Sequence, residues 1–241
     1  MKEITFIIPC AGKGSRLGAP WPKELYVIDK EVCLIDKCFN HISQFKNICQ
    51  VVIIISEEKM ELVKYLSKYK EDFDIIFCYQ KPQFKELGGA IKSAENYLSK
   101  KNILLLPDLL LSDRFIDLKM QTYINNLNRD NIAYIIKEEK NPEVLTKLGN
   151  VLINEDNIIT EVVDKPTIDK IKEKNYQHYW CSFGFTDKIK DQFLDEFDKL
   201  ISKQPLPENN CLIGGTAVYI WKAIDLGVWT NIHKYFKDLE D

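Results

Sequence analysis

Strand-length apolar runs alternate with amphipathic segments through the first half of the chain, and this alternation limits the folds open to it. The apolar runs cover residues 4–8, 50–55, 73–79, 103–106 and 132–136. Between them, apolar residues recur at helical spacing over 34–45, 62–69, 87–98 and 114–127. Strands joined by helices at this spacing are typical of βαβ crossovers. The pattern predicts an α/β fold with a Rossmann-like, doubly wound and mainly parallel sheet, covered by helices on both faces.

The second half of the chain has a different pattern. Residues 150–153 and 158–163, separated by the turn residues Asn154-Glu155-Asp156-Asn157, predict a β-hairpin. A further strand is expected over 179–185, and helices are expected over 187–201, 215–224 and 231–236. The sequence contains no internal repeat, low-complexity tract or flexible linker, so we expect the two halves to share one core.

Composition narrows the class of protein. The chain has 241 residues and a formal net charge of −3, so no global basic field favours binding to nucleic acid. Its apolar runs are far shorter than the roughly 20 residues that cross a bilayer, and its first residues lack the pattern of a signal peptide. Seven scattered cysteines without a Cys-x-x-Cys pair predict buried, reduced thiols rather than a zinc site. We therefore expect a cytoplasmic enzyme or binding protein with neither nucleic acid nor membrane as a partner.

The first apolar run leads into the loop Ala11-Gly12-Lys13-Gly14-Ser15-Arg16, and Lys23 follows shortly after. Gly12 and Gly14 let backbone N–H groups turn toward one point, which makes an anion-binding concavity. Arg16 adds a planar fork for phosphate oxygens, and Lys23 adds a mobile point charge. A tight turn with solvated cations would explain Gly-x-Gly alone, whereas the loop together with both cations favours phosphate binding. The loop lacks the Walker spacing, so it is not that of a P-loop NTPase.

Four further polar segments follow predicted elements: Gln80, Asp108 and the triplet at 164–166 follow strands, and Asp225 follows a predicted helix. Asp108 comes directly after a buried strand, where a carboxylate suits Mg²⁺ and equally suits capping of the next turn. Asp225, the triplet Asp164-Lys165-Pro166 and Gln80 are ordinary turn or loop residues when each is taken alone. Ligands of such sheets bind beyond the carboxyl ends of the strands. The order of these segments along the chain is therefore more informative than any one of them.

In this order the segments resemble the nucleotidylyltransferases that activate sugar 1-phosphates, the sugar-nucleotide pyrophosphorylases. The opening signature of that family, Gly-x-Gly-Ser/Thr-Arg followed by Pro-Lys, stands here at 12–16 and 22–23. Pro22-Lys23-Glu24-Leu25 is most similar to the uridylyl and thymidylyl branch. The other matching segments are Gln80 through Ala90, Asp108, Gly149 with Asp164-Lys165-Pro166, and Asp225-Leu226-Gly227. The resemblance covers nearly the whole chain.

The resemblance implies a nucleotidyltransferase fold of the GT-A type and an enzyme that condenses a nucleoside triphosphate with a phosphorylated acceptor. It favours a sugar 1-phosphate as acceptor, with an NDP-sugar and pyrophosphate as products. It also implies Mg²⁺ as cofactor, allows a homo-oligomer, and implies a single domain, 1–241, with a nucleotide-binding half at 1–140 and an acceptor-binding half at 141–241. By position, the residues implied are Arg16 and Lys23 for catalysis, Ala11, Gly12, Gly14, Gln80 and Gly88 for the nucleotide, Gly149, Asp164 and Lys165 for the acceptor, and Asp108 and Asp225 for the metal.

The chain departs from the family pattern at three places. Pro107 and Glu86 stand where glycine is usual, and the strand 181–185 carries the unusual wording Cys-Ser-Phe-Gly-Phe. These departures leave the base and the acceptor open, so a cytidylyltransferase acting on a non-sugar phosphate is one alternative. A glycosyltransferase of related fold is disfavoured because Asp108 is not part of an Asp-x-Asp motif. A non-catalytic nucleotide-binding subunit is disfavoured because the charged residues of the signature are all retained.

Overall fold

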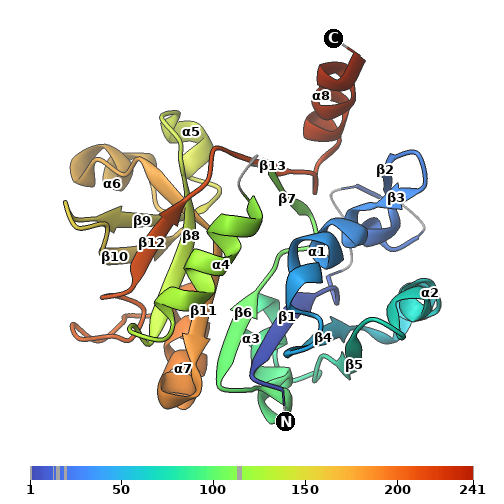
Figure 1. Ribbon diagram of the computed structural model, residues 1–241. Helices are drawn as coiled ribbons and strands as arrows, with labels where there is room; N and C mark the ends of the chain where they lie inside the picture. Colours follow the sequence, from blue (N-terminus) through green and yellow to red (C-terminus); the bar gives the residue numbers. More distant parts are fainter. Residues whose placement is uncertain (1, 13, 15–16, 19–20, 113–115, 241) are drawn as a thin grey trace.

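A nine-stranded mixed sheet forms the centre of the protein (Figure 1). The structure is a computed structural model that describes residues 2–12, 14, 17–18, 21–112 and 116–240. Four strands from the first half lie parallel and adjacent, in the order β6 (Lys101–Leu104), β1 (Ile4–Pro9), β4 (Cys49–Ile55) and β5 (Asp74–Tyr79). Their carboxyl ends are aligned by the register, because Pro9 pairs with Ile54 and Ile55 pairs with Tyr79.

The second half joins this sheet through β11 (His178–Thr186), which runs antiparallel to β6. The same strand pairs with β9 (Gly149–Ile153), the first strand of a hairpin with β10 (Ile159–Asp164), and with β8 (Ile132–Glu138). A further strand, β12 (Thr216–Tyr219), lies parallel to β8. In the described chain, β10 and β11 run against the other seven strands of the sheet. The predicted α/β class, mainly parallel sheet and hairpin are therefore confirmed.

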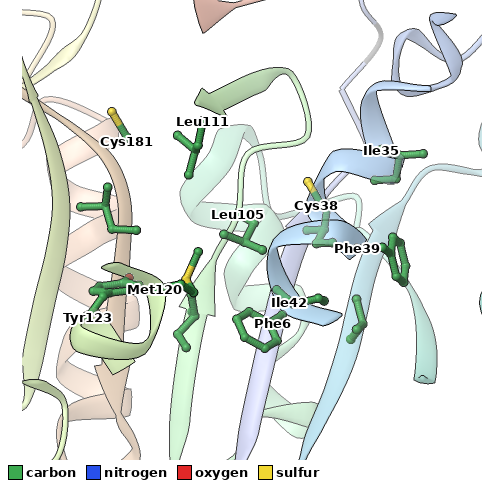
Figure 2. Packing of buried hydrophobic residues seen from close by; sticks show 14 of the residues in the cluster. Phe6, Ile35, Cys38, Phe39, Ile42, Leu105, Leu111, Met120, Tyr123 and Cys181 are labelled. Carbon is green, nitrogen blue, oxygen red and sulfur yellow. The ribbon is translucent and has the colours of Figure 1, made fainter. Parts of the chain in front are cut away.

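Helices cover both faces of the sheet. One face packs against α1 (Leu34–Ile42), α2 (Met60–Leu66) and α4 (Ile116–Asn126), and the other packs against α3 (Glu86–Ser93) and α7 (Lys190–Ile201). Alternate residues of β1 enter the two cores, with Phe6 in the first and Ile7 in the second. Figure 2 shows the first core, where Phe6 lies near Ile42 of α1 and Leu105. The shorter helices are α5 (Pro142–Leu145), α6 (Ile168–Lys174), η2 (Ser43–Phe45), η3 (Glu57–Lys59), η4 (Ser67–Tyr69), η5 (Glu95–Tyr97) and η6 (Asp187–Ile189).

Small elements gather beyond the carboxyl ends of the parallel strands, at the top of Figure 1. They are η1 (Lys23–Leu25), the pair β2 (Val27–Asp29) and β3 (Val32–Cys33), the pair β7 (Leu109–Ser112) and β13 (Lys222–Asp225), and the last helix α8 (Trp229–Glu240). A third, smaller core holds them together and consists of Leu17, Ile28, Leu34, Leu110, Leu226 and Ile232. This core lies outside the two main ones and fixes the segments that surround the edge of the sheet.

The sequence pattern is wrong over 215–224, where it predicts a helix. The chain there forms β12 and β13, because Thr216–Tyr219 pairs with β8 and Lys222–Asp225 pairs with β7. Gly215 lies so close to Ile132 that a side chain would overlap the neighbouring strand. The last helix is also longer than predicted, since it begins at Trp229 rather than near Asn231.

Two predictions from composition can be compared with the fold. Six of the seven cysteines are buried and Cys211 is half-buried, in agreement with the expected apolar surroundings. Within the described chain, none of the helices has both the length and the hydrophobicity needed to cross a bilayer.

Asp36, in the first turn of α1, is a buried carboxylate surrounded by donors. It accepts hydrogen bonds from Cys33 N at 2.8 Å, Tyr65 Oη at 2.5 Å and Tyr69 Oη at 2.8 Å, and it pairs with Lys68 Nζ at 2.9 Å. Burial by itself would raise the pKa of Asp36. The bonds from Tyr65, Lys68, the Cys33 amide and Tyr69 outweigh burial and lower that pKa from its ordinary value.

We expect Asp36→Asn to lower the free energy of unfolding at neutral pH by about 2 kcal/mol, because an amide satisfies these donors poorly. The unfolded aspartate binds a proton at a higher pH than the folded one. Asp36 therefore stabilises the folded protein fully at pH values above the ordinary aspartate pKa. This contribution is lost as the pH falls toward the lowered pKa of Asp36 in the folded state. Urea unfolding followed by circular dichroism measures both effects. Below about pH 4 the wild type should lose stability more steeply than the variant, and equal slopes would contradict this account.

Candidate active site

The loop after β1 has an open backbone at Gly12 and a left-handed turn at Gly14. Gly14 has a φ of +62°, which glycine adopts without strain, and its carbonyl accepts hydrogen bonds from the N–H groups of Leu17 at 2.9 Å and Gly18 at 3.2 Å. Among the described residues, no heavy atom beyond the chain neighbours of Gly12 lies within 4 Å of the position that a Cβ would take. A ligand can therefore approach the backbone closely at Gly12.

The other residues predicted for this loop have different positions. Ala11 is half-buried and packs against the second core. Arg16, predicted as a catalytic residue, lies outside the described residues, as do Lys13 and Ser15.

Lys23 reaches the same edge from η1. Its Nζ lies 2.5 Å from Asp108 Oδ2, and the two side chains are 15% and 17% exposed. The lysine stem packs against the glycine loop, since a Cβ on Gly14 would lie 3.6 Å from the Lys23 Cβ. Lys23 thus lies between two other predicted residues, Gly14 of the loop and Asp108, which is remote in the sequence.

The pairing of β7 with β13 brings Asp225 beside Asp108. Asp225 pairs with Leu109, and the N–H of Leu226 donates to the Asp108 carbonyl at 2.8 Å. Oδ1 of Asp225 accepts a hydrogen bond from the N–H of Gly227 at 2.7 Å, which orients the carboxylate. Two acidic residues that are far apart in the sequence therefore lie close together, Asp225 at the end of β13 and Asp108 directly before β7.

Carboxylates are the kind of ligand that Mg²⁺ takes when it binds together with a substrate. Mg²⁺ prefers oxygen ligands and is usually held by one or two carboxylates plus water and phosphate oxygens. Groups of three or more His, Cys, Asp or Glu that could hold a metal by themselves do not occur among the described residues. Asp108 and Asp225 would accordingly hold an ion whose remaining ligands come from solvent and from phosphate.

Gln80 follows β5, and the orientation of its side-chain amide is determined by its neighbours. Its Nε2 lies 2.8 Å from the Phe84 carbonyl and 3.3 Å from the Glu86 carbonyl. Both neighbours are acceptors, so the amide nitrogen must face them, and Oε1 remains as an acceptor for a ligand. Glu86 has a φ of +55°, a conformation that glycine adopts more readily than glutamate. The backbone therefore keeps the glycine-like turn although the residue differs.

Gly88 is buried where α3 meets α7. A Cβ at this position would lie 2.8 Å from Asp198 Oδ1 and 2.9 Å from Asp198 Cα, so a larger residue would force the helices apart. Helix packing thus explains this glycine, and its contact with a base remains a prediction.

The acceptor residues predicted from the sequence lie together at the base of the β9–β10 hairpin. Gly149 pairs with Asp164, and a side chain on Gly149 would overlap the indole of Trp180. Lys165 Nζ lies 2.9 Å from Asp164 Oδ2, with the lysine side chain 54% exposed and the aspartate 4% exposed. Lys165 has a φ of +45°, and strained backbone of this kind clusters at functional sites.

A groove of about 640 Å³ extends from these residues. It runs along β10 and is closed on the other side by the segment 203–210 that follows α7. Asp164 and Lys165 line one end of it. The groove is large enough for a small phosphorylated molecule.

Tyr179 of β11 lies beside the hairpin that carries the predicted acceptor residues. It pairs with Asn150, the neighbour of Gly149. Burial raises the pKa of Tyr179, and the neighbouring Cys181 and Glu139 contribute to the same shift. The sequence pattern did not single out Tyr179, because an aromatic residue in an apolar strand looks like a core residue.

Solved structures share this fold over nearly the whole chain. UDP-glucose pyrophosphorylase complexed with UDP-glucose matches with a TM-score of 0.76 at 18% identity, covering 100% of this chain and 99% of that chain. UTP-bound UGPase from Acinetobacter baumannii matches with a TM-score of 0.73 at 16% identity, covering 99% and 93%. A candidate glucose-1-phosphate thymidylyltransferase from Bacillus anthracis in complex with sucrose matches with a TM-score of 0.75 at 18% identity, covering 99% and 96%.

The chain has the fold of these enzymes. Neither the family models nor the curated protein sequences give a match. At identities below one fifth, the likeness establishes the architecture of the chain, whereas chemistry depends on the residues of the site.

Of two glycine substitutions in the loop, Gly12→Ala should weaken ligand binding, whereas Gly14→Ala should lower stability. Gly12→Ala should leave the thermal midpoint unchanged, because the added methyl meets open space, but should weaken triphosphate binding by about tenfold through steric conflict with the ligand. Gly14→Ala should lower stability by about 1 kcal/mol, because alanine is strained at positive φ. Differential scanning fluorimetry and titration calorimetry with a triphosphate measure these effects. Wild-type affinity in Gly12→Ala would show that phosphates do not bind here.

Proposed function

We propose that this protein is a nucleotidylyltransferase that condenses a nucleoside triphosphate with a phosphorylated small molecule, in the first place a sugar 1-phosphate, and releases pyrophosphate. One observation carries the proposal. The glycine loop, Lys23, Asp108 and Asp225 come from four separate segments and meet at one edge of the sheet. The fold shared with UDP-glucose pyrophosphorylase supports it. A cytoplasmic location and a homo-oligomer are further parts of the proposal and rest on the family resemblance.

In the proposed reaction, an oxygen of the acceptor phosphate attacks the α-phosphorus of the triphosphate. A P–O bond forms between the acceptor and the α-phosphorus. The bond from the α-phosphorus to the bridging oxygen of the β-phosphate breaks, and its electron pair leaves with pyrophosphate. No covalent bond to the protein is needed, so the protein acts by positioning the reactants and stabilising their charge.

The charged residues at the edge have separate roles in this proposal. Lys23 polarises the α-phosphate, and Arg16 neutralises the leaving pyrophosphate, a role taken from the resemblance alone. Asp108 and Asp225 hold Mg²⁺, which supplies neutralisation of the phosphate oxygens. The contact between Lys23 and Asp108 balances their charges at a partly buried edge.

The acceptor is proposed to bind at the base of the hairpin. Lys165 is half-exposed and can place its ammonium on the acceptor phosphate, while Asp164 accepts a hydrogen bond from a hydroxyl. The lining of the adjoining groove combines apolar side chains with four uncharged hydrogen-bonding ones, namely Thr160, Thr167, Gln204 and Asn210. The hydrogen-bonding side chains are proposed to orient the hydroxyl groups of the acceptor.

The side chain of Gln80 favours uracil or thymine as the base. Its Nε2 is held by two backbone carbonyls, so it offers Oε1 as an acceptor. Uracil and thymine carry an N–H donor at ring position 3, where cytosine carries an acceptor. Pairing two acceptors leaves both unsatisfied, which costs about 1–3 kcal/mol when they are buried.

A panel of triphosphates and acceptors tests the base and the acceptor. We expect UTP or dTTP with glucose 1-phosphate to release pyrophosphate at least about tenfold faster than CTP, from the cost of the mismatched base. Phosphocholine serves as the non-sugar acceptor. A preference for CTP with phosphocholine would replace this proposal by the cytidylyltransferase alternative, and release of nucleoside diphosphate from a nucleotide sugar would indicate a glycosyltransferase.

Removing the charge of either carboxylate should strongly reduce turnover without unfolding the protein. We expect Asp108→Asn and Asp225→Asn each to lower kcat by roughly a hundredfold or more, as loss of charge stabilisation does at comparable sites. Asp72→Asn is the matched control, since Asp72 is half-exposed and pairs with Lys46 on the surface. EDTA should inhibit the wild type and added Mg²⁺ should restore it. Near-normal pyrophosphate release from either site variant would contradict the assignment.

A further inference from the structure

Glu24 and Lys59 form a buried ion pair next to the candidate site. Glu24 Oε2 lies 2.8 Å from Lys59 Nζ, with the glutamate side chain 0% exposed and the lysine 7% exposed. Glu24 belongs to η1 and directly follows Lys23, whereas Lys59 ends η3, the turn after β4. The pair therefore ties the segment that carries Lys23 to the strand beside β1.

The pair also lies close to the start of the glycine loop. Cys10 is the last residue before Ala11, and its N–H donates to the Ile54 carbonyl at 2.7 Å. Burial raises the pKa of the Cys10 thiol, and the Glu24 charge contributes next.

Stability alone is a weak reason for burying these two charges. Moving both out of water is costly, and apolar residues of similar size are often neutral or stabilising in place of a buried ion pair. A second cost is visible in Glu24 Oε1, which is buried and has no hydrogen-bond partner among the described residues. Unlike apolar residues, the ion pair holds η1 in one defined orientation.

We propose that Glu24 and Lys59 are positioning residues that orient Lys23; the part of this inference that concerns catalysis rests on the function proposed above. Successive residues of a 3₁₀ helix point about 120° apart. With Glu24 held by Lys59 in the interior, Lys23 points to the edge of the sheet. There its stem lies against Gly14 and its ammonium lies 2.5 Å from Asp108.

Two measurements on the full chain test this inference, and one of them does not depend on turnover. The first is the rate at which acetic anhydride modifies Lys23 in the folded protein, followed by mass spectrometry of its peptide. The second is kcat and KM for pyrophosphate release. The variants are Glu24→Gln, Lys59→Met and the double variant Glu24→Met with Lys59→Met, which removes both charges and is expected to fold.

The matched control is Glu196→Gln. Glu196 is a similarly buried carboxylate, but it lies in α7 and accepts a hydrogen bond from the N–H of Cys211 at 2.6 Å. The Glu196→Gln substitution should lower the midpoint of urea unfolding without changing the acetylation rate of Lys23.

We expect the acetylation rate of Lys23 to rise severalfold in Glu24→Gln, in Lys59→Met and in the double variant, and to stay at the wild-type value in Glu196→Gln. Turnover should fall about tenfold or more in kcat with little change in the KM for the triphosphate, because the lysine is misplaced rather than removed. A double variant with wild-type acetylation of Lys23 would overturn the inference and reduce the pair to a space-filling role. Absence of turnover in the wild type would refute the proposed function alone, since acetylation would still decide the position of Lys23.

Discussion

The candidate site depends on the short antiparallel pairing of β7 with β13. These strands lie outside the main sheet, yet their register is what brings Asp225 beside Asp108 across more than a hundred residues of sequence. The N–H of Leu226 donates to the Asp108 carbonyl, and this hydrogen bond lies next to the last pair of the two strands, Asp225 with Leu109. Since two four-residue strands are weak by themselves, the third core must hold them, with Leu110 and Leu226 inside it. The third core therefore determines how Asp108 and Asp225 lie relative to each other.

Two residues of the site are held in backbone conformations that their side chains disfavour. Glu86 and Lys165 have positive φ angles of 55° and 45°, and a non-glycine residue in this region costs roughly 1–2 kcal/mol. At Glu86 the loop is supported by the Gln80 amide, which bonds to the Glu86 carbonyl. The backbone at Glu86 therefore follows a path that glycine adopts more readily than glutamate.

The spacing of apolar and turn residues predicts the elements that the local sequence determines, namely the buried parallel strands and the hairpin. The roles expected for Asp108, Lys165 and Asp225 come from the family resemblance. What the sequence misses depends on tertiary contact. The region 215–224 forms strands only because β8 and β7 offer partners, and the burial of Lys59 has no local signal, since a lysine among glutamates looks like a solvated helix start. The packing of Gly88 against α7 likewise has no signal in one sequence, and the contact of Gly88 with a base stays a prediction.

The three residues of η1 link the parts of the molecule that the site needs. Because a 3₁₀ helix has three residues per turn, each side chain leaves in its own direction. Lys23 contacts Asp108 at the edge, Glu24 contacts Lys59 in the interior, and Leu25 packs against the first core. Tyr26, which follows, packs edge-on against Trp229 of α8, and the Trp229 indole N–H donates to the Leu17 carbonyl at 2.8 Å. A single turn of helix therefore couples the glycine loop, the acidic pair, the main core and the last helix, which is why one misplaced side chain in it would disturb the others.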